Sequence, residues 1–271
     1  MLLTPVLWST AGVVTRHVER ATPFEQVFWR SLVAALFVAA FLFFTGKKPR
    51  IGRPMLFSGA MWAVMFTAFV VALSLTTVAN TLVVMSVAPL LTAFLSFVIL
   101  KEAVSARTWL AAGAAAVGIA WMFHDGFAGG HLAGMLIASL IPLASAANLV
   151  ALRAAAARVD LVPAIMLGGF LSALIAVPMA LPLQASAKDL ALLSFLGVFQ
   201  LGVPCMLMVV VSRVLPPPEI ALLSLLEVLL GVLWAWLLIG ERPGVAALYG
   251  GGIVLAALVL NEISTMRQKP V

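Results

Sequence analysis

Long apolar runs alternate along the chain with short connections of charged, proline or glycine residues. Most runs hold about 20 residues, which as an α-helix span about 30 Å and match the hydrocarbon core of a bilayer. No connection exceeds about a dozen residues, so no extramembrane domain is expected between the runs. The pattern predicts ten membrane-spanning helices, at residues 2–17, 24–45, 54–75, 78–100, 105–124, 131–152, 161–182, 189–210, 217–240 and 243–262.

Composition supports lipid as the surrounding solvent. Of the 271 residues, 64% are hydrophobic and only 10% are charged, whereas a soluble domain is nearer half apolar and a quarter charged. The net charge of +6 does not indicate a nucleic-acid partner, because the basic residues are scattered at helix ends and form no basic patch. The chain is therefore expected to be an integral membrane protein.

Lys and Arg are distributed unequally over the two sets of connections. With the N-terminus inside, eleven of the 16 fall in inside connections, and the outside ones hold Arg16, Arg20, Lys188 and Arg242. Positive residues stay on the cytoplasmic side of membranes. Both termini are therefore predicted to be cytoplasmic, with the bacterial cytoplasmic (inner) membrane as the expected location.

An internal repeat divides the chain into 1–124 and 131–262. At an offset of 139 positions, residues 79–120 align with 218–259, so that Leu100-Lys101-Glu102 meets Ile239-Gly240-Glu241. At an offset of 137, Pro5 meets Pro142. Each repeat holds five helices, an odd number, so the second must be inverted relative to the first. The expected fold is an all-α membrane protein of ten transmembrane helices in two inverted five-helix repeats, the usual plan of secondary transporters.

Several motifs resemble those of EamA-type permeases of the drug/metabolite transporter superfamily: Phe28-Trp29-Arg30-Ser31, Thr77-Val78-Ala79-Asn80-Thr81 with Ala88-Pro89-Leu90, and Leu225-Leu226-Glu227 with Gly240-Glu241-Arg242-Pro243. The resemblance implies a central cavity walled mainly by helices 1, 3, 4, 6, 8 and 9, and transport without ATP. Many members export amino acids or other metabolites. Many also carry a proline in helix 9 shortly after the glutamate. Here Val228 and Val232 occupy those positions, which puts symmetric bending of helices 4 and 9 in doubt.

Glu227 is the most informative single residue, because it lies near the middle of an apolar helix. A charge at that depth costs from about 3 to more than 10 kcal/mol, so the side chain is expected to face a cavity, find a partner or be protonated. Helical spacing places Ser224, Gly231 and Trp234 on its face. The functional interpretation is substrate binding or proton coupling, and the alternative is a structural hydrogen bond between helices.

The other candidates are weaker, and each has a structural alternative. Asn148 and Gln200 could contact substrate or bond between helices. Trp8 and Trp234 could wall the cavity, while Trp62, Trp121 and Trp236 are assigned to lipid or the interface. Asn80 and Glu219 could gate the cavity or cap helices, and Pro89 could provide a gating kink or a static one. For Arg30 a structural role is favoured, because helix 2 is usually peripheral in the family.

No cofactor or metal site is predicted, because His17, His124 and His131 lack ligand spacing and the sequence holds no phosphate loop. The favoured function is a secondary transporter and not an enzyme, acting on a small-molecule solute with protons as a candidate coupling ion. A membrane-embedded lipid-modifying enzyme and a channel or assembly subunit remain alternatives. Small residues in helix 10, Gly250 to Gly252 and Ala256, leave a homodimer open.

Overall fold

A computed structural model describes residues 1–107, 109–111, 113–114, 117–118, 121, 132–240, 244–245, 248–253, 256–257 and 260. Within these ranges the regular structure is helical and holds no strand. The helices expected at 105–124 and 243–262 lie only partly within the described residues, while His124, His131 and the motif Glu241-Arg242-Pro243 lie outside them. The number of ten helices therefore stays a prediction.

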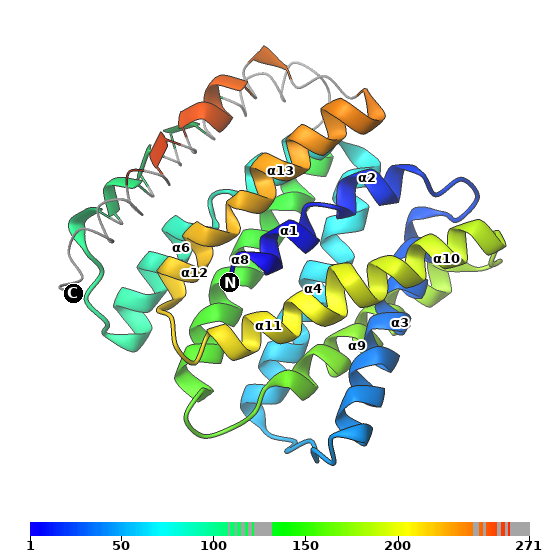
Figure 1. Ribbon diagram of the computed structural model, residues 1–271, viewed down its shortest axis with the longest axis horizontal. Coiled ribbons are helices and arrows are strands. Elements are labelled where there is room, and N and C mark those ends of the chain that lie inside the picture. Colours follow the sequence, from blue (N-terminus) through cyan, green and yellow to red (C-terminus); the bar gives the residue numbers. More distant parts are fainter. Residues whose placement is uncertain are drawn as a thin grey trace.

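Six described helices are long and apolar enough to cross a bilayer. They begin and end within a few residues of the predicted bounds, because charged residues and prolines stop each apolar run. Figure 1 shows them packed side by side. They are α3 (Pro23–Phe44), α4 (Arg53–Leu75), α8 (Leu132–Ala155), α9 (Val162–Ala180), the stack of α10 (Ala187–Phe195), η2 (Leu196–Gly202) and α11 (Val203–Val211), and the stack of α12 (Pro217–Ser224), α13 (Leu226–Trp234) and η3 (Ala235–Ile239).

Two further predicted helices are interrupted. Residues 2–17 form α1 (Leu3–Trp8) and α2 (Ala11–Arg16), and residues 78–100 form α5 (Val78–Met85), α6 (Ala88–Leu95) and the π-helical η1 (Ser96–Leu100). Between α1 and α2, the hydroxyls of Ser9 and Thr10 donate to the carbonyls of Val6 and Leu7. Such local bonds compete with the helical ladder and account for the break.

The internal repeat is visible in the backbone itself. The break between α5 and α6 at Ser86 and Val87 corresponds at the offset of 139 to the break between α12 and α13 at Leu225. The π-helical segments η1 and η3 match at the same offset, as do the left-handed residues Lys101 (φ 57°) and Gly240 (φ 74°) that end them. Two stretches of different sequence thus fold with the same irregularities.

Helix 9 is interrupted like helix 4, although it lacks the proline. In helix 4, Pro89 lies in the first turn of α6 and supplies no amide hydrogen. In helix 9, the Ser224 hydroxyl donates to the carbonyl of Ile220 at 2.8 Å, a bond that tends to bend helices. The two helices are thus interrupted at matching positions, whereas symmetric bending stays untested.

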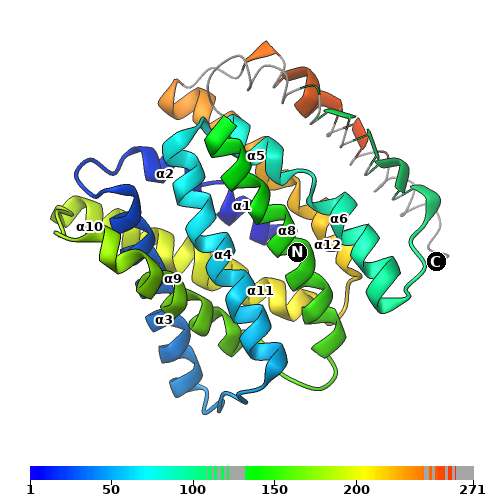
Figure 2. The same cartoon turned by 180° about the vertical axis from the view of Figure 1, so that it is seen from behind.

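Corresponding helices of the two repeats run in opposite directions. α3 and α9 pack along their length and meet at both ends, as Figure 2 shows. Near the start of α3, Glu25 accepts bonds from the amides of Gln184 and Ala185, which follow α9. Beyond the end of α3, Lys47 pairs with Asp160, which precedes α9. The pair is antiparallel, as an inverted repeat requires.

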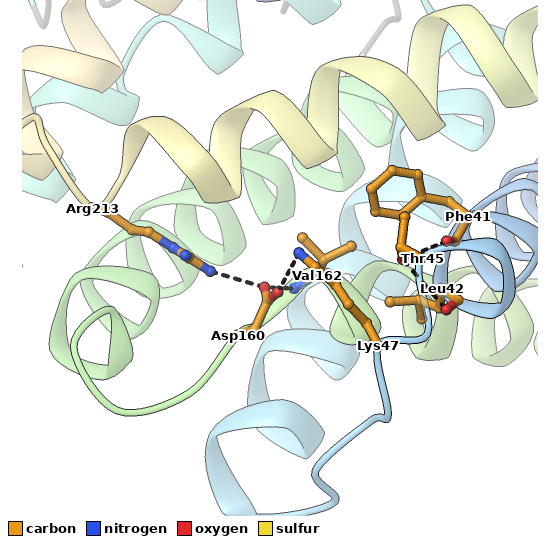
Figure 3. A network of polar contacts seen from close by, with 7 residues as sticks. All are labelled: Phe41, Leu42, Thr45, Lys47, Asp160, Val162 and Arg213. Atoms are coloured by element: carbon orange, nitrogen blue, oxygen red, sulfur yellow. Dashed lines mark hydrogen bonds and ion pairs between the residues drawn. The ribbon is translucent and has the colours of Figure 1, made fainter.

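One end of the molecule is held together by Asp160 (Figure 3). Its carboxylate accepts bonds from Lys47 at 3.0 Å, from Arg213 at 3.0 Å and from the Val162 amide at 3.1 Å. Arg153 extends this network by donating to the Arg213 carbonyl at 3.4 Å. The four side chains all lie in connections predicted to share one face of the membrane.

We expect Asp160→Asn to lower the melting temperature of the purified protein at pH 7 by a few degrees or less, because partly exposed ion pairs contribute about 1 kcal/mol or less each. Burial alone would raise the pKa of Asp160, but bonds from Val162, Lys47 and Arg213 outweigh it and hold the pKa below its usual value. A lowered folded-state pKa stabilises the protein above the unfolded pKa, about 4, and this contribution is lost as pH falls through the folded value.

The difference between wild type and Asp160→Asn should therefore shrink as pH falls below about 4. Glu19→Gln is the control, because its pair with Lys188 is exposed at 56% and 66% and such pairs contribute little. Equal melting temperatures of wild type and Asp160→Asn at pH 7 would contradict this role.

Candidate functional site: a central cavity between the repeats

A cavity of about 100 Å³ lies among the helices, with walls from α1, α3, α4, α8 and the interrupted helices 4, 8 and 9. This volume is about two thirds of that of an engineered cavity of about 150 Å³ that holds benzene. The walls named from the resemblance, helices 1, 3, 4, 6, 8 and 9, all contribute to it. Helix 2 also contributes, through Arg30.

Lining positions from the two repeats correspond, but their chemistry differs. At the offset of 139, Met85 and Ala88 match Ser224 and Glu227, and all four line the cavity. The aromatic lining residues all come from the first repeat: Trp8, Trp62, Phe66 and Phe69. The lining carboxylate and the uncharged amide and hydroxyl side chains all come from the second: Ser145, Asn148, Gln200, Ser224 and Glu227. By origin in the chain, the lining therefore has an aromatic half from the first repeat, which also carries Arg30, and a polar half from the second.

Glu227 lies in the first turn of α13, directly after the break at Leu225, and is 6% exposed. Its carboxylate has no ion pair or hydrogen bond to the described residues, and it lines the cavity together with Ser224. The start of a helix favours negative charge because its amide dipoles point toward it. The break thus places an acceptor group where a solute would lie.

Arg30 lines the cavity, and its hydrogen bonds to neighbouring helices are of the structural kind favoured from sequence. Its guanidinium donates from Nη2 to the Phe66 carbonyl at 2.6 Å and from Nη1 to Gln200 Oε1 at 3.3 Å. It also lies 5.7 Å from the centre of the Phe69 ring, where cation–π attraction operates. The Arg30 cation of the first repeat therefore contacts Gln200, a polar lining residue of the second repeat.

Asn148 and Gln200 form bonds between helices, one of the two roles that the sequence left open, and both line the cavity. Asn148 Oδ1 accepts a bond from the Ser58 hydroxyl at 2.7 Å, and Gln200 Oε1 accepts from Arg30. Their side-chain nitrogens have no acceptor among the described residues, so each amide is oriented by one bond and keeps its donors for a solute.

Four candidates lie outside the described cavity lining. Asn80 donates from Nδ2 to Thr76 Oγ1 at 3.0 Å, and Trp234 donates from Nε1 to Ser9 Oγ at 3.2 Å. Glu219 lies in the first turn of α12, and Pro89 is buried in the first turn of α6. Trp234 thus ties helix 9 to the break in helix 1, while the other three lie in the first turns of half-helices.

The aromatic wall of helix 3 was not recognised from sequence. Trp62, which was assigned to the membrane interface, is 3% exposed and lines the cavity with Phe66 and Phe69. Trp121 and Trp236 are 65% and 51% exposed, as expected for lipid-facing residues. The spacing of i, i+4 and i+7 puts the three ring residues of helix 3 on one face.

The fold and cavity define an all-helical integral membrane protein with a central cavity between two repeats. The model of the EamA-like transporter family matches residues 1–124 and 132–262. The chain belongs to this family. No curated protein matches the chain.

A solved structure named "Crystal structure of protein" is similar, with a TM-score of 0.77 and 18% sequence identity over 96% of this chain and 95% of that one. At that identity the similarity concerns the fold alone.

We expect Gly168→Ala to destabilise the protein and displace Trp62. A Cβ at Gly168 would lie 2.4 Å from Trp62 Cβ and 2.9 Å from the Gly59 carbonyl oxygen, and overpacking of this kind costs roughly 1–3 kcal/mol. Gly251→Ala is the matched control, because a Cβ there meets nothing within 4 Å. The measurement is melting temperature with tryptophan fluorescence. Equal effects of the two substitutions would contradict the close packing behind the aromatic wall.

Proposed function

We propose that the chain is a secondary transporter of a small metabolite, and specifically an exporter of amino acids or related compounds. The supporting observation is the cavity between corresponding, oppositely directed helices of the two repeats. Helices interrupted at matching positions are the usual site of solute binding in such carriers. The fold we propose has ten transmembrane helices in two inverted repeats, 1–124 and 131–262.

The mechanism that we propose is alternating access around this cavity. The polar networks at the two ends hold the connections, while the interrupted helices 4 and 9 bend at Ser86–Val87 and Leu225. For the cavity to open to one side of the membrane or the other, the bond between Trp234 and Ser9 or the contacts around Arg153 would have to break. Glu227 would bind solute or carry a coupling proton, and Asn148, Gln200, Ser224 and Trp8 would complete the binding site.

Family membership favours transport over the two alternatives, a membrane-embedded lipid-modifying enzyme and a channel or assembly subunit. Counterflow in proteoliposomes separates them. A carrier loaded with unlabelled solute accumulates labelled solute transiently, a channel only equilibrates it, and an enzyme forms product. If no compound in a panel of amino acids and related metabolites showed transient accumulation of label, the proposed transport function would be wrong.

We expect Glu227→Gln to lower counterflow by at least about tenfold while the protein stays folded, because hydrogen bonds to a charged group contribute about 1.5–3 kcal/mol. Glutamine keeps the size of the side chain and removes its charge. Glu19→Gln is the control, since Glu19 lies in an exposed connection and pairs only with Lys188. Wild-type counterflow in Glu227→Gln would exclude the proposed role.

The proposed orientation puts both termini in the cytoplasm. In a Cys205→Ala background, which removes the single cysteine of the sequence, we expect an impermeant maleimide to label Lys188→Cys in intact cells. Lys48→Cys should be labelled only after the membrane is permeabilised. Both lysines are exposed, so the reverse pattern would contradict the orientation.

A homodimer through helix 10 remains a possible assembly. Gly250 packs within the chain, because a Cβ on Gly118 would lie 2.9 Å from its carbonyl oxygen. Gly251 and Gly252 have open space around a Cβ position, so these two positions are the ones available to a second copy.

A further inference from the structure

Two buried hydrogen-bond donors at the cavity have no acceptor among the described residues. Arg30 Nε and Trp62 Nε1 are completely buried nitrogens without an acceptor among the described residues, and both residues line the cavity. The remaining unpartnered atoms are oxygens of Thr4, Thr15, Gln26 and Ser96, and none of these residues belongs to the described lining. A buried donor without an acceptor is costly, and the two here lie on neighbouring helices beside the same empty space.

The charge of Arg30 is also uncompensated by the described residues. Arg30 is 1% exposed, and the acceptors of its two hydrogen bonds are a neutral carbonyl and a neutral amide. A guanidinium has five N–H donors, so most of its donor capacity is free. Glu25, one and a half turns earlier on α3, is occupied by the amides of Gln184 and Ala185. Glu227 lines the same cavity but forms no ion pair with Arg30.

We propose that the transported solute carries an anionic group, in the simplest case a carboxylate, that binds to Arg30 and to the indole N–H of Trp62. This inference rests on the proposed function, because it assigns a binding mode to the solute of the same cavity. The planar guanidinium matches a carboxylate in geometry as well as charge. The bond from Arg30 to the Phe66 carbonyl attaches the guanidinium to α4, the helix that also carries Trp62.

The arrangement also orients the rest of the solute. An anion held at Arg30 places the attached apolar group beside Phe66, Phe69 and Trp8, which form the aromatic half of the cavity. Glu227 is free to accept a bond from a cationic or donor group of the same molecule. A zwitterion would therefore use both charges of the cavity, whereas a simple organic acid would use Arg30 alone.

The test compares matched ligands on the purified wild-type protein by thermal shift. Alanine, valine and phenylalanine are compared with their carboxamides, and the amine-free acids propionate, 3-methylbutanoate and 3-phenylpropionate with theirs. We expect at least one acid to bind, and at least about tenfold more tightly than its amide, because the amide loses a charge-assisted bond. 2-Phenylethylamine, which carries only a cation, should not bind. Selectivity restricted to the amino acids identifies a zwitterion, and selectivity shared with the amine-free acids identifies an anion; both support the proposal.

Variants then locate the anion. We expect Arg30→Gln and Trp62→Phe to reduce the preference for the acid over its amide at least about fivefold, and Arg158→Gln to leave it unchanged, since Arg158 is an exposed cation away from the cavity. If Arg30→Gln does not fold, the Trp62→Phe variant and the comparison of acid with amide on the wild-type protein test the anion site instead.

Equal binding of acid and amide, tightest binding of the amine, or no binding by any acid overturns the anion site. None of these outcomes contradicts the transporter proposal, which counterflow of other solutes would still support. If acids bind but no solute shows counterflow, the transport proposal is contradicted and the anion-site proposal is supported.

Discussion

Lipid offers no hydrogen bonds, so each polar group inside the molecule needs a partner there. Most of the buried polar side chains have one. The buried carboxylates of Glu25 and Asp189 accept backbone amides at one end of the molecule, and a chain of hydroxyls, Ser31, Ser172 and Thr67, joins α3, α9 and α4 in the middle. These satisfied groups fix the helices relative to one another. At the cavity, by contrast, Arg30 Nε and Trp62 Nε1 are buried donors without an acceptor among the described residues.

The same constraint explains why the helices could be located from sequence. A bilayer requires about 20 apolar residues per crossing, and Lys47, Pro54 and the prolines at 216–218 cannot be placed inside such a run. The offset of 139 then predicted the repeat, and the matched breaks and left-handed caps at Lys101 and Gly240 bear it out in the backbone. The interruption of helix 9 was not predicted, because it depends on the Ser224 hydroxyl and not on a proline.

The cavity was only partly predictable, for a physical reason. Glu227, Asn148 and Gln200 were detectable because polar side chains in apolar helices need an explanation. Trp62 and Phe66 gave no such signal, since an apolar residue is equally suited to lipid, to a helix interface and to a solute. Arg30 was assigned to structure because helix 2 was expected at the periphery. Its side chain reaches Gln200 on another helix, and a reach of that kind cannot be deduced from spacing along one helix.

An unequal pair of repeats is what an oriented solute requires. Two identical halves would build a cavity with two equivalent ends, in which a polar group could bind either way round. Here Met85 and Ala88 of the first repeat correspond to Ser224 and Glu227 of the second, and the aromatic lining residues all come from the first repeat. The backbone keeps the symmetry that rocking between two states needs, while the side chains abandon it. In the proposed carrier, the lining side chains would set how the solute is oriented, and the backbone would set how the helices move. Substitutions in the lining would then change the preferred solute without changing the movement of the helices.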